Sequence, residues 1–222
     1  QIIMKIYYCY RQNRKDEMDF LKKLFEDFPE AERVNVCRDE DELEEKELKA
    51  LLKALNDTYY LEDSLFKESL LEVDEIISVL NNCDWLNQEK RTEYSDKLQE
   101  VKGKKLFVAK SRKQVTFDAV VTDGDHKYYW EFHEKQHRQK KHATENHIKK
   151  IFMFGDNEPE FKVERCLQRF IKDYWRAKFI KNFTIVWWDW FLKNKSDIEF
   201  DLRPGFNEYF IEGKFSFSSL FD

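Results

Sequence analysis

Asp118, Glu131 and His133 are of residue types whose side chains can bind metal ions and activate water. Asp118 lies inside one short apolar stretch, and Glu131 and His133 alternate along the next one. An acidic side chain within a buried strand costs free energy unless it is paired or binds a partner. Carboxylate oxygens are the ligands that Mg²⁺ prefers, and a bound divalent ion lowers the pKa of its water. The three residues therefore suggest metal-assisted hydrolysis.

A second pattern in the same stretch suggests a different chemistry. The run from His133 to His137 (HEKQH) matches the zinc-peptidase signature HExxH, in which two histidines bind zinc from one face of a helix. That signature requires a helix, whereas the aromatic residues 128–132 follow a turn and predict a strand that runs into His133. We favour a strand hairpin over a zinc helix, and a zinc-dependent peptidase that uses His133, Glu134 and His137 remains the alternative.

The charges of the chain are divided unevenly between its two halves. The whole chain carries 39 Lys+Arg and 44 Asp+Glu, a net charge of −5. Residues 1–100 hold 15 basic and 26 acidic side chains, a net of −11, and residues 101–222 hold 24 and 18, a net of +6. A polyanion is therefore expected to bind the second half, which also contains Asp118, Glu131 and His133.

Composition narrows the class of protein. With 20 Phe among its 222 residues, the chain can bury a sizeable core, which argues against intrinsic disorder. Neither GxGxxG nor a P-loop motif is present, so no nucleotide cofactor is expected. The 4 cysteines are scattered, and no apolar run is long enough to span a membrane. We expect a cytoplasmic protein with no membrane partner.

The spacing of apolar residues predicts a mainly α-helical part over residues 1–102. A strand is expected at its start, over residues 4–11. Apolar residues that recur with helical periodicity then predict four helices, over residues 16–28, 41–56, 63–80 and 87–101. Asp118, Glu131 and His133 all come after this part of the chain.

Residues 103–222 are predicted to form the α/β catalytic core. Alternating and β-prone segments predict strands over residues 106–109, 115–122, 127–133, 151–154, 182–190 and 208–217, with a helix over 159–179. This helix would return the strand at 182–190 to the sheet beside the earlier strands. The fold class is therefore α/β, with a mixed central β-sheet flanked by helices and an α-helical N-terminal part, together forming one compact unit.

A hairpin would bring the three residues to one place. Side chains alternate along a strand, so Glu131 and His133 point to the same face, and Asp118 reaches that face from the partner strand. Asp118, twelve intervening residues and then Glu131-x-His133, on two strands after a helical segment, resemble the PD-(D/E)xK nuclease superfamily. Type II restriction endonucleases are small stand-alone members of that superfamily.

The resemblance implies a restriction-endonuclease-like core and a Mg²⁺-dependent endonuclease that hydrolyses double-stranded DNA, with Mn²⁺ able to substitute. Asp118 and Glu131 would hold the metal, and His133 would position or deprotonate the attacking water. Two residues depart from the family pattern, because Phe117 stands where Pro precedes the Asp, and His133 stands where the Lys is expected. A histidine lacks the permanent charge of a lysine.

Further residues would complete such an enzyme. Lys135, on the same strand face as His133, would take the role of the missing lysine, and Glu68 or Glu72 would supply an additional carboxylate from a preceding helix. Polar and basic residues that flank the two strands would contact DNA: Arg112, Lys113, His137, Arg138, Gln139, Lys140 and Lys141. Palindromic cutting implies a homodimer. A nucleic-acid-binding protein without catalytic activity is a further alternative.

Overall fold

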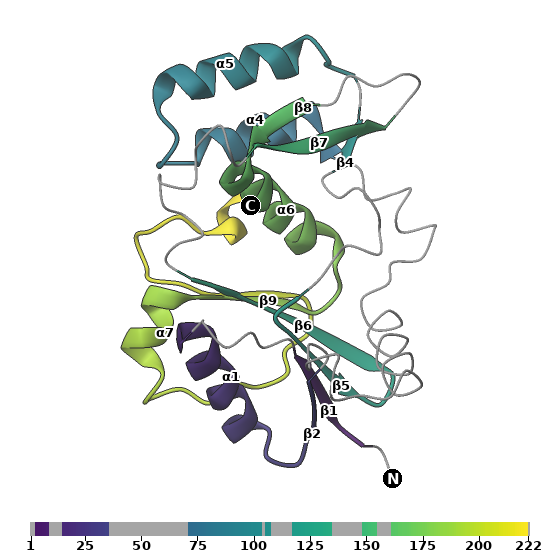
Figure 1. Cartoon of the computed structure of the whole chain (residues 1–222), viewed down its shortest axis with the longest axis vertical. Coiled ribbons are helices and arrows are strands. Elements are labelled where there is room, and N and C mark those ends of the chain that lie inside the picture. The colour runs from purple at the N-terminus through teal and green to yellow at the C-terminus, as the bar shows by residue number, and fades with distance from the viewer. Residues whose placement is uncertain are drawn as a thin grey trace, which may run out of the picture. The chain divides into compact units, whose positions relative to one another are not determined.

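The computed structural model describes residues 3–8, 15–35, 71–103, 105–107, 117–134, 148–154 and 161–221. The chain divides into two compact units and passes between them several times. The first unit takes residues 1–60, 115–134 and 181–214, and the second takes residues 61–114, 135–180 and 215–222. Each unit has its own β-sheet (Figure 1). Asp118, Glu131 and His133 all belong to the first unit.

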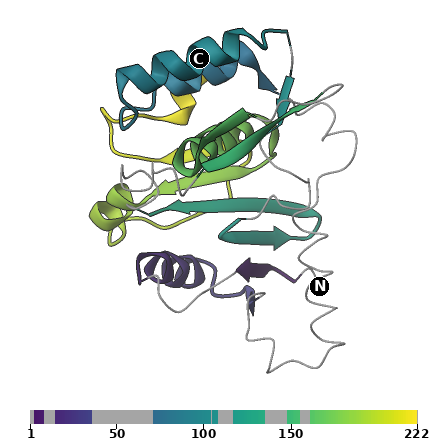
Figure 2. The same ribbon diagram turned by 45° about the horizontal axis from the view of Figure 1, so that its top comes forward.

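A mixed six-stranded sheet forms the centre of the first unit. In spatial order its strands are β10 (Phe206–Tyr209), β9 (Phe183–Trp187), β6 (His126–His133), β5 (Ala119–Asp123), β1 (Lys5–Tyr8) and β2 (Glu32–Asn35). β6 is antiparallel to β5 and parallel to β9, so both of its edges are hydrogen-bonded (Figure 2). This arrangement confirms the predicted α/β class with a mixed, helix-flanked sheet.

A tight turn joins β5 to β6. Asp123 pairs with His126, which leaves Gly124 and Asp125 as the two turn residues. Gly124 has a φ of 61°, a conformation that glycine adopts without steric cost. A positive φ at the first turn residue is typical of the type II′ hairpin, whose twist matches that of the strands. The turn fixes the register in which Ala119 lies opposite Trp130.

Two helices, α1 (Lys15–Asp27) and α7 (Trp188–Asn194), pack on one face of this sheet (Figure 1). From α1, Phe20 stacks on Phe132 of β6, with ring centroids 5.0 Å apart, and Phe191 of α7 meets the same ring at 5.6 Å. Trp130 and Phe132 are each 1% exposed. Burying such a side chain stabilises the fold by roughly 1.5–3 kcal/mol. Because β6 turns its even-numbered residues into this core, Glu131 and its odd-numbered neighbours face the other way.

The second unit contains an antiparallel four-stranded sheet. Its order is β3 (Leu71–Glu72), β4 (Lys105–Phe107), β7 (Ile148–Phe154) and β8 (Phe161–Glu164). Its helices are α4 (Val73–Asn81), α5 (Gln88–Gln99), α6 (Arg165–Phe179) and the short 3₁₀ helix η6 (Phe217–Leu220). The Tyr94 hydroxyl of α5 donates to the buried Glu164 carboxylate at the start of α6.

Helices α4 and α6 are joined by a polar cluster around Glu75. Its carboxylate accepts hydrogen bonds from the Lys178 ammonium and, at 3.0 Å, from the Tyr174 hydroxyl. It also accepts the backbone N–H of Glu72 at 2.8 Å. Burial tends to raise the pKa of this carboxyl, but the three donors together with the Lys178 charge lower it below its ordinary value.

Several predicted elements agree with the structure. The helices expected at 16–28 and 87–101 are α1 and α5, and the strand expected at 4–11 contains β1. The strands expected at 106–109, 115–122, 127–133 and 151–154 correspond to β4, β5, β6 and β7. The strand expected at 182–190 does return beside β6, as β9.

Other boundaries were wrong. The helix expected over 159–179 begins only at Arg165, because residues 161–164 form β8 and pair with β7. The helix expected over 63–80 begins at Val73, because Leu71 and Glu72 pair with β4 as β3.

The last two predicted strands end early. The strand expected over 182–190 ends at Trp187, whose partner His133 is the last residue of β6, and the chain continues as α7. The strand expected over 208–217 is β10, which runs from Phe206 to Tyr209. The helix expected over 41–56 lies outside the described residues. Within the described ranges, no helix combines the length and apolar character needed to cross a membrane.

Candidate active site

Asp118 lies at the point where the pairing between β5 and β6 ends. Its backbone N–H donates to the carbonyl of Trp130 at 3.1 Å, and its side-chain Oδ2 accepts the backbone N–H of Phe132 at 2.7 Å. That N–H belongs to the peptide that joins Glu131 to Phe132. A carboxylate has about four lone-pair sites, so accepting one amide leaves it the capacity to bind a cation. Asp118 is thereby held against the backbone of the strand that carries Glu131.

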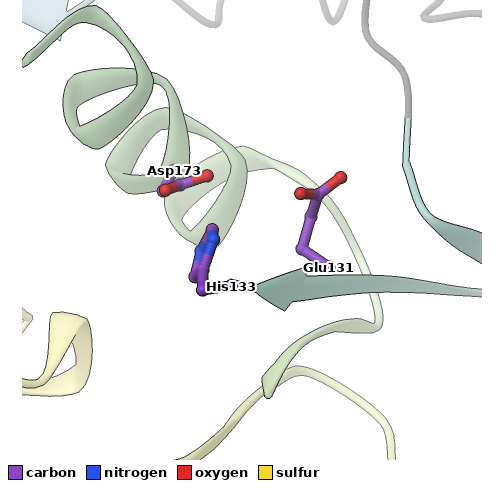
Figure 3. A group of neighbouring side chains, drawn as sticks. All are labelled: Glu131, His133 and Asp173. Atoms are coloured by element: carbon purple, nitrogen blue, oxygen red, sulfur yellow. The ribbon is translucent and has the colours of Figure 1, made fainter. Parts of the chain in front are cut away.

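Glu131 and His133 lie two residues apart near the end of β6. Both side chains point to the same side of the strand (Figure 3). In the register with β9, Glu131 lies opposite Ile185 and His133 lies opposite Trp187. Glu131 is half-buried, and His133 is 3% exposed. The strand therefore presents a carboxylate and an imidazole together on the face away from α1, as the alternation predicted.

The neighbours of this pair on the adjacent strands are largely apolar. Tyr129, two residues before Glu131 and therefore on the same face, lies opposite the fully buried Phe183. Burial raises the pKa of Tyr129 to about 12. Ile185 and Val120, both 0% exposed, lie next to these residues on the neighbouring strands. Charges in such surroundings interact more strongly than charges in water.

His133 packs against an aromatic side chain that is itself anchored. Its ring centroid is 4.9 Å from that of Trp187, with an interplanar angle of 51°. The Trp187 indole N–H donates to the Glu208 carboxylate at 2.8 Å. His133, Trp187 and Glu208 come from the three adjacent strands β6, β9 and β10. We call these three residues the His–Trp–Glu row.

The donor set of the site suits a hard divalent cation. Asp118 and Glu131 offer oxygen ligands, which Mg²⁺ and Mn²⁺ accept, whereas imidazole nitrogen is more typical of Zn²⁺ and Cu²⁺. Half-buried and buried polar groups of this kind are stable only when they are paired or bind a ligand. The two carboxylates offer oxygen ligands to such an ion, and the His133 imidazole offers a nitrogen that can accept or donate a proton.

The zinc-peptidase motif does not have the geometry that it requires over its described part. His133 is the final residue of a strand, and Glu134 follows it outside any helix, with its side chain buried. Residues 127–133, which the peptidase alternative needs as a helix, are extended. His137 lies outside the described residues.

The remaining predicted site residues fall into two groups. Glu72 is described: it is exposed and immediately precedes α4 in the second unit. The others lie outside the described residues: Glu68, Arg112, Lys113, Lys135, His137, Arg138, Gln139, Lys140 and Lys141. Their roles remain predictions.

Sequence reasoning overlooked two acidic residues. Glu208 accepts the indole N–H of Trp187. It lies 75 positions after His133 in the sequence, so no local pattern connects it with that residue. Asp173 comes from α6 of the second unit (Figure 3). It is 1% exposed and accepts a hydrogen bond from Arg176 at 3.0 Å. A signal for Asp173 existed, because it lies three residues after Phe170 and four before Ala177 on the apolar stripe of its helix.

Comparisons with known proteins add no identification. No protein-family model, curated protein or solved structure matches the chain.

Proposed function

We propose that the protein is a divalent-metal-dependent endonuclease that hydrolyses phosphodiester bonds of double-stranded DNA. The proposal is carried by one observation, the placement of the Asp118 carboxylate 2.7 Å from the backbone nitrogen that follows Glu131. Two carboxylates at the end of one strand pair, with a histidine two residues further, provide oxygen ligands and a proton acceptor together. The same combination on two strands underlies the resemblance to PD-(D/E)xK nucleases.

Each residue has a defined task in this proposal. Asp118 and Glu131 would hold Mg²⁺, or Mn²⁺ in its place. The bound ion would lower the pKa of a water and neutralise charge on the phosphate. His133 accepts a proton from the attacking water at one ring nitrogen, while the other is a hydrogen-bond donor in the neutral ring. His133 carries no permanent positive charge. In this scheme Lys135 therefore neutralises the phosphate charge, as the lysine of the family pattern would.

DNA is the proposed substrate because of charge. The segment 101–150, which contains Asp118 and Glu131, has 13 basic and 6 acidic side chains. Neutralising phosphates releases counterions, so basic segments of this kind favour nucleic acids. A restriction enzyme that cuts a palindrome on both strands would act as a homodimer and would work in the cytoplasm.

Digestion of a supercoiled plasmid tests the proposal. The parent protein with Mg²⁺ or Mn²⁺ is expected to yield discrete fragments, and EDTA is expected to abolish them. Glu131→Gln keeps the size of the side chain and removes its charge, so it should bind DNA while cutting at least ~100-fold more slowly. Glu212→Gln, at an exposed position in the same unit, is the matched control and should cut like the parent.

Three outcomes would contradict the proposal. Intact plasmid with both metals, at protein concentrations that shift the DNA in a gel, would favour a binding protein without catalysis. Equal rates of cutting by the parent and by Glu131→Gln would show that Glu131 is not a ligand of the catalytic metal. Metal-dependent hydrolysis of casein, lost on chelation and restored by zinc, would favour the peptidase alternative.

A further inference from the structure

We propose that Trp187 and Glu208 are positioning residues for His133, and that Glu208 acts through the indole of Trp187. The inference rests on the proposed function, because His133 is the group that contacts the attacking water there. Trp187 lies on β9 and Glu208 on β10, and neither residue belongs to a catalytic motif.

The register of the sheet places the three side chains on one face. His133 lies directly opposite Trp187, and Glu208 lies opposite Ile185, two residues before Trp187 on β9. Residues two apart on a strand share a face, so Ile185, Trp187 and Glu208 point to the same side. Diagonal neighbours on adjacent strands are about 7–8 Å apart at their Cα atoms, within reach of long side chains. The His–Trp–Glu row is thus a consequence of strand pairing.

The contacts in the row restrict the histidine ring. His133 is the last residue of β6, so the ladder does not continue beyond it. Its ring packs against an aromatic neighbour whose ring centroid is 4.9 Å away. Torsions of this sp³–sp² type have broad minima, so packing rather than intrinsic preference decides the ring orientation.

The hydrogen bond to Glu208 fixes the indole in turn. Its length of 2.8 Å lies within the usual range for an N–H···O hydrogen bond. The indole N–H is a donor with no acceptor function, and its direction sets the plane of the ring. Loss of the acceptor removes one restraint on the tilt of Trp187, and the surface against which His133 packs changes with that tilt.

A double-mutant cycle separates this chain of contacts from simple packing. Glu208→Gln keeps an acceptor oxygen for the indole and should behave like the parent. Glu208→Leu removes the acceptor, and Trp187→Phe keeps an aromatic ring but removes the donor. Each should lower kcat for plasmid cleavage by roughly tenfold to a hundredfold with little change in KM, as expected for a misplaced catalytic group. The double variant should be no worse than either single variant, because both remove one hydrogen bond.

A second readout does not depend on cleavage. In protein labelled with ¹³C-histidine, the His133 ring signals, assigned with His133→Gln, carry a ring-current shift from Trp187. Glu208→Gln should leave these signals unchanged, and Glu208→Leu should move them by several tenths of a ppm or broaden them. If the parent does not cut DNA but the signals respond in this way, the proposed function fails while the positioning of His133 stands.

Two results would overturn the inference. In the first, Glu208→Leu leaves both kcat and the His133 signals at their parent values. In the second, Glu208→Gln loses as much activity as Glu208→Leu, which would mean that the negative charge acts directly rather than through Trp187. Thermal unfolding of each variant, compared with Glu212→Gln, identifies a loss of activity that arises from a loss of fold.

Discussion

Asp118 and Phe132 are joined by a hydrogen bond in which the carboxylate Oδ2 accepts the backbone N–H at 2.7 Å. This bond lies just beyond the last paired residues of the β5–β6 ladder, Ala119 and Trp130. The side chain of Asp118 therefore satisfies an N–H of β6 beyond the end of regular pairing. One residue thus has a structural task through one oxygen and, in our proposal, a catalytic task as a metal ligand.

The two tasks of Asp118 can be separated by substitution. Asp118→Asn keeps a carbonyl oxygen for the Phe132 N–H but loses the charge, so we expect cleavage to fall at least ~100-fold. The free energy of unfolding should change by less than ~1 kcal/mol, since the hydrogen bond persists. Asp118→Ala should lose the same activity and also ~1–3 kcal/mol of stability, because a backbone N–H loses its acceptor. Plasmid digestion and urea denaturation of both variants measure the difference. Equal stability of the two variants would show that the hydrogen bond contributes nothing.

Removal of the Glu131 charge should weaken metal binding. For Glu131→Gln we expect the dissociation constant of Mn²⁺, measured by isothermal titration calorimetry without DNA, to rise at least ~10-fold. An amide oxygen still coordinates but carries no charge. The matched control is again Glu212→Gln, which should bind Mn²⁺ like the parent. Unchanged Mn²⁺ affinity in Glu131→Gln would place the metal elsewhere.

Asn182 joins three strands from a strained position. Its φ is 59°, its Nδ2 donates to the carbonyl of Lys127 at 3.3 Å, and its Oδ1 accepts the backbone N–H of Gly205 at 3.0 Å. Asn182→Ala loses both bonds and keeps a Cβ in the left-handed conformation without the short polar side chain that makes it tolerable, so it should cost roughly 2–4 kcal/mol. Asn182→Gly also loses both bonds, but glycine adopts the left-handed conformation without steric cost. It should therefore cost about 1 kcal/mol less than Asn182→Ala. Urea unfolding measures both, and the reverse order would contradict the argument.

The Glu75 cluster predicts sensitivity to acid. The folded-state pKa of Glu75 is lowered by Lys178, the Glu72 N–H and Tyr174, which together outweigh the raising effect of burial. A depressed carboxyl pKa stabilises the fold above the unfolded-state value of about 4.3, and this contribution is lost as the pH falls through the folded-state value. Compared with Glu75→Gln, the parent should be more stable at pH 7 by roughly 1 kcal/mol, reduced by partial exposure of the pair. The advantage should shrink between pH 5 and pH 3 in urea titrations. An advantage independent of pH would contradict this origin.

Asp173 and Arg176 form a buried pair whose members depend on each other. Their side chains are 1% and 9% exposed, with N and O atoms 3.0 Å apart. Asp173→Ala leaves a buried guanidinium without this partner and should cost roughly 3–5 kcal/mol. Replacing both residues, as Asp173→Leu with Arg176→Met, should recover most of that loss. As the exposed comparison, Asp201→Ala breaks a pair with Arg203 and should cost less than ~1 kcal/mol. A double variant as unstable as Asp173→Ala would show that packing, not charge, is at fault.

The predictable part of the fold was the part governed by local patterns. Alternation in residues 127–133 and the Gly124 turn were sufficient to place β6 and to put Glu131 and His133 on one face. The apolar spacing in α1 was equally clear, since Phe20, Leu21 and Leu24 recur at helical intervals. These elements follow from periodicity alone, and tertiary structure did not override them.

The remaining boundaries depended on partners that the sequence does not reveal. Residues 188–190 are strongly β-prone, yet they are helical because β6 ends at His133 and offers no further hydrogen bonds to β9. Residues 161–164 carry a helical apolar pattern but pair with β7. Likewise, no local pattern could have connected Glu208 to Trp187, because their contact exists only through the parallel pairing of β9 and β10. Tertiary context overrides local preference in each case.

The order of strands in the six-stranded sheet has a consequence during synthesis. β1 pairs with β5, which follows it by more than a hundred residues, and β6 acquires its second neighbour only when β9 has been made. Such long-range pairings make folding slow compared with a fold of local contacts. A growing chain that has not reached Trp187 has Asp118, Glu131 and His133 but lacks the strand against which the histidine packs. If the protein cuts DNA as proposed, a chain that ends before β9 is not expected to cut DNA, because His133 then lacks its packing partner Trp187.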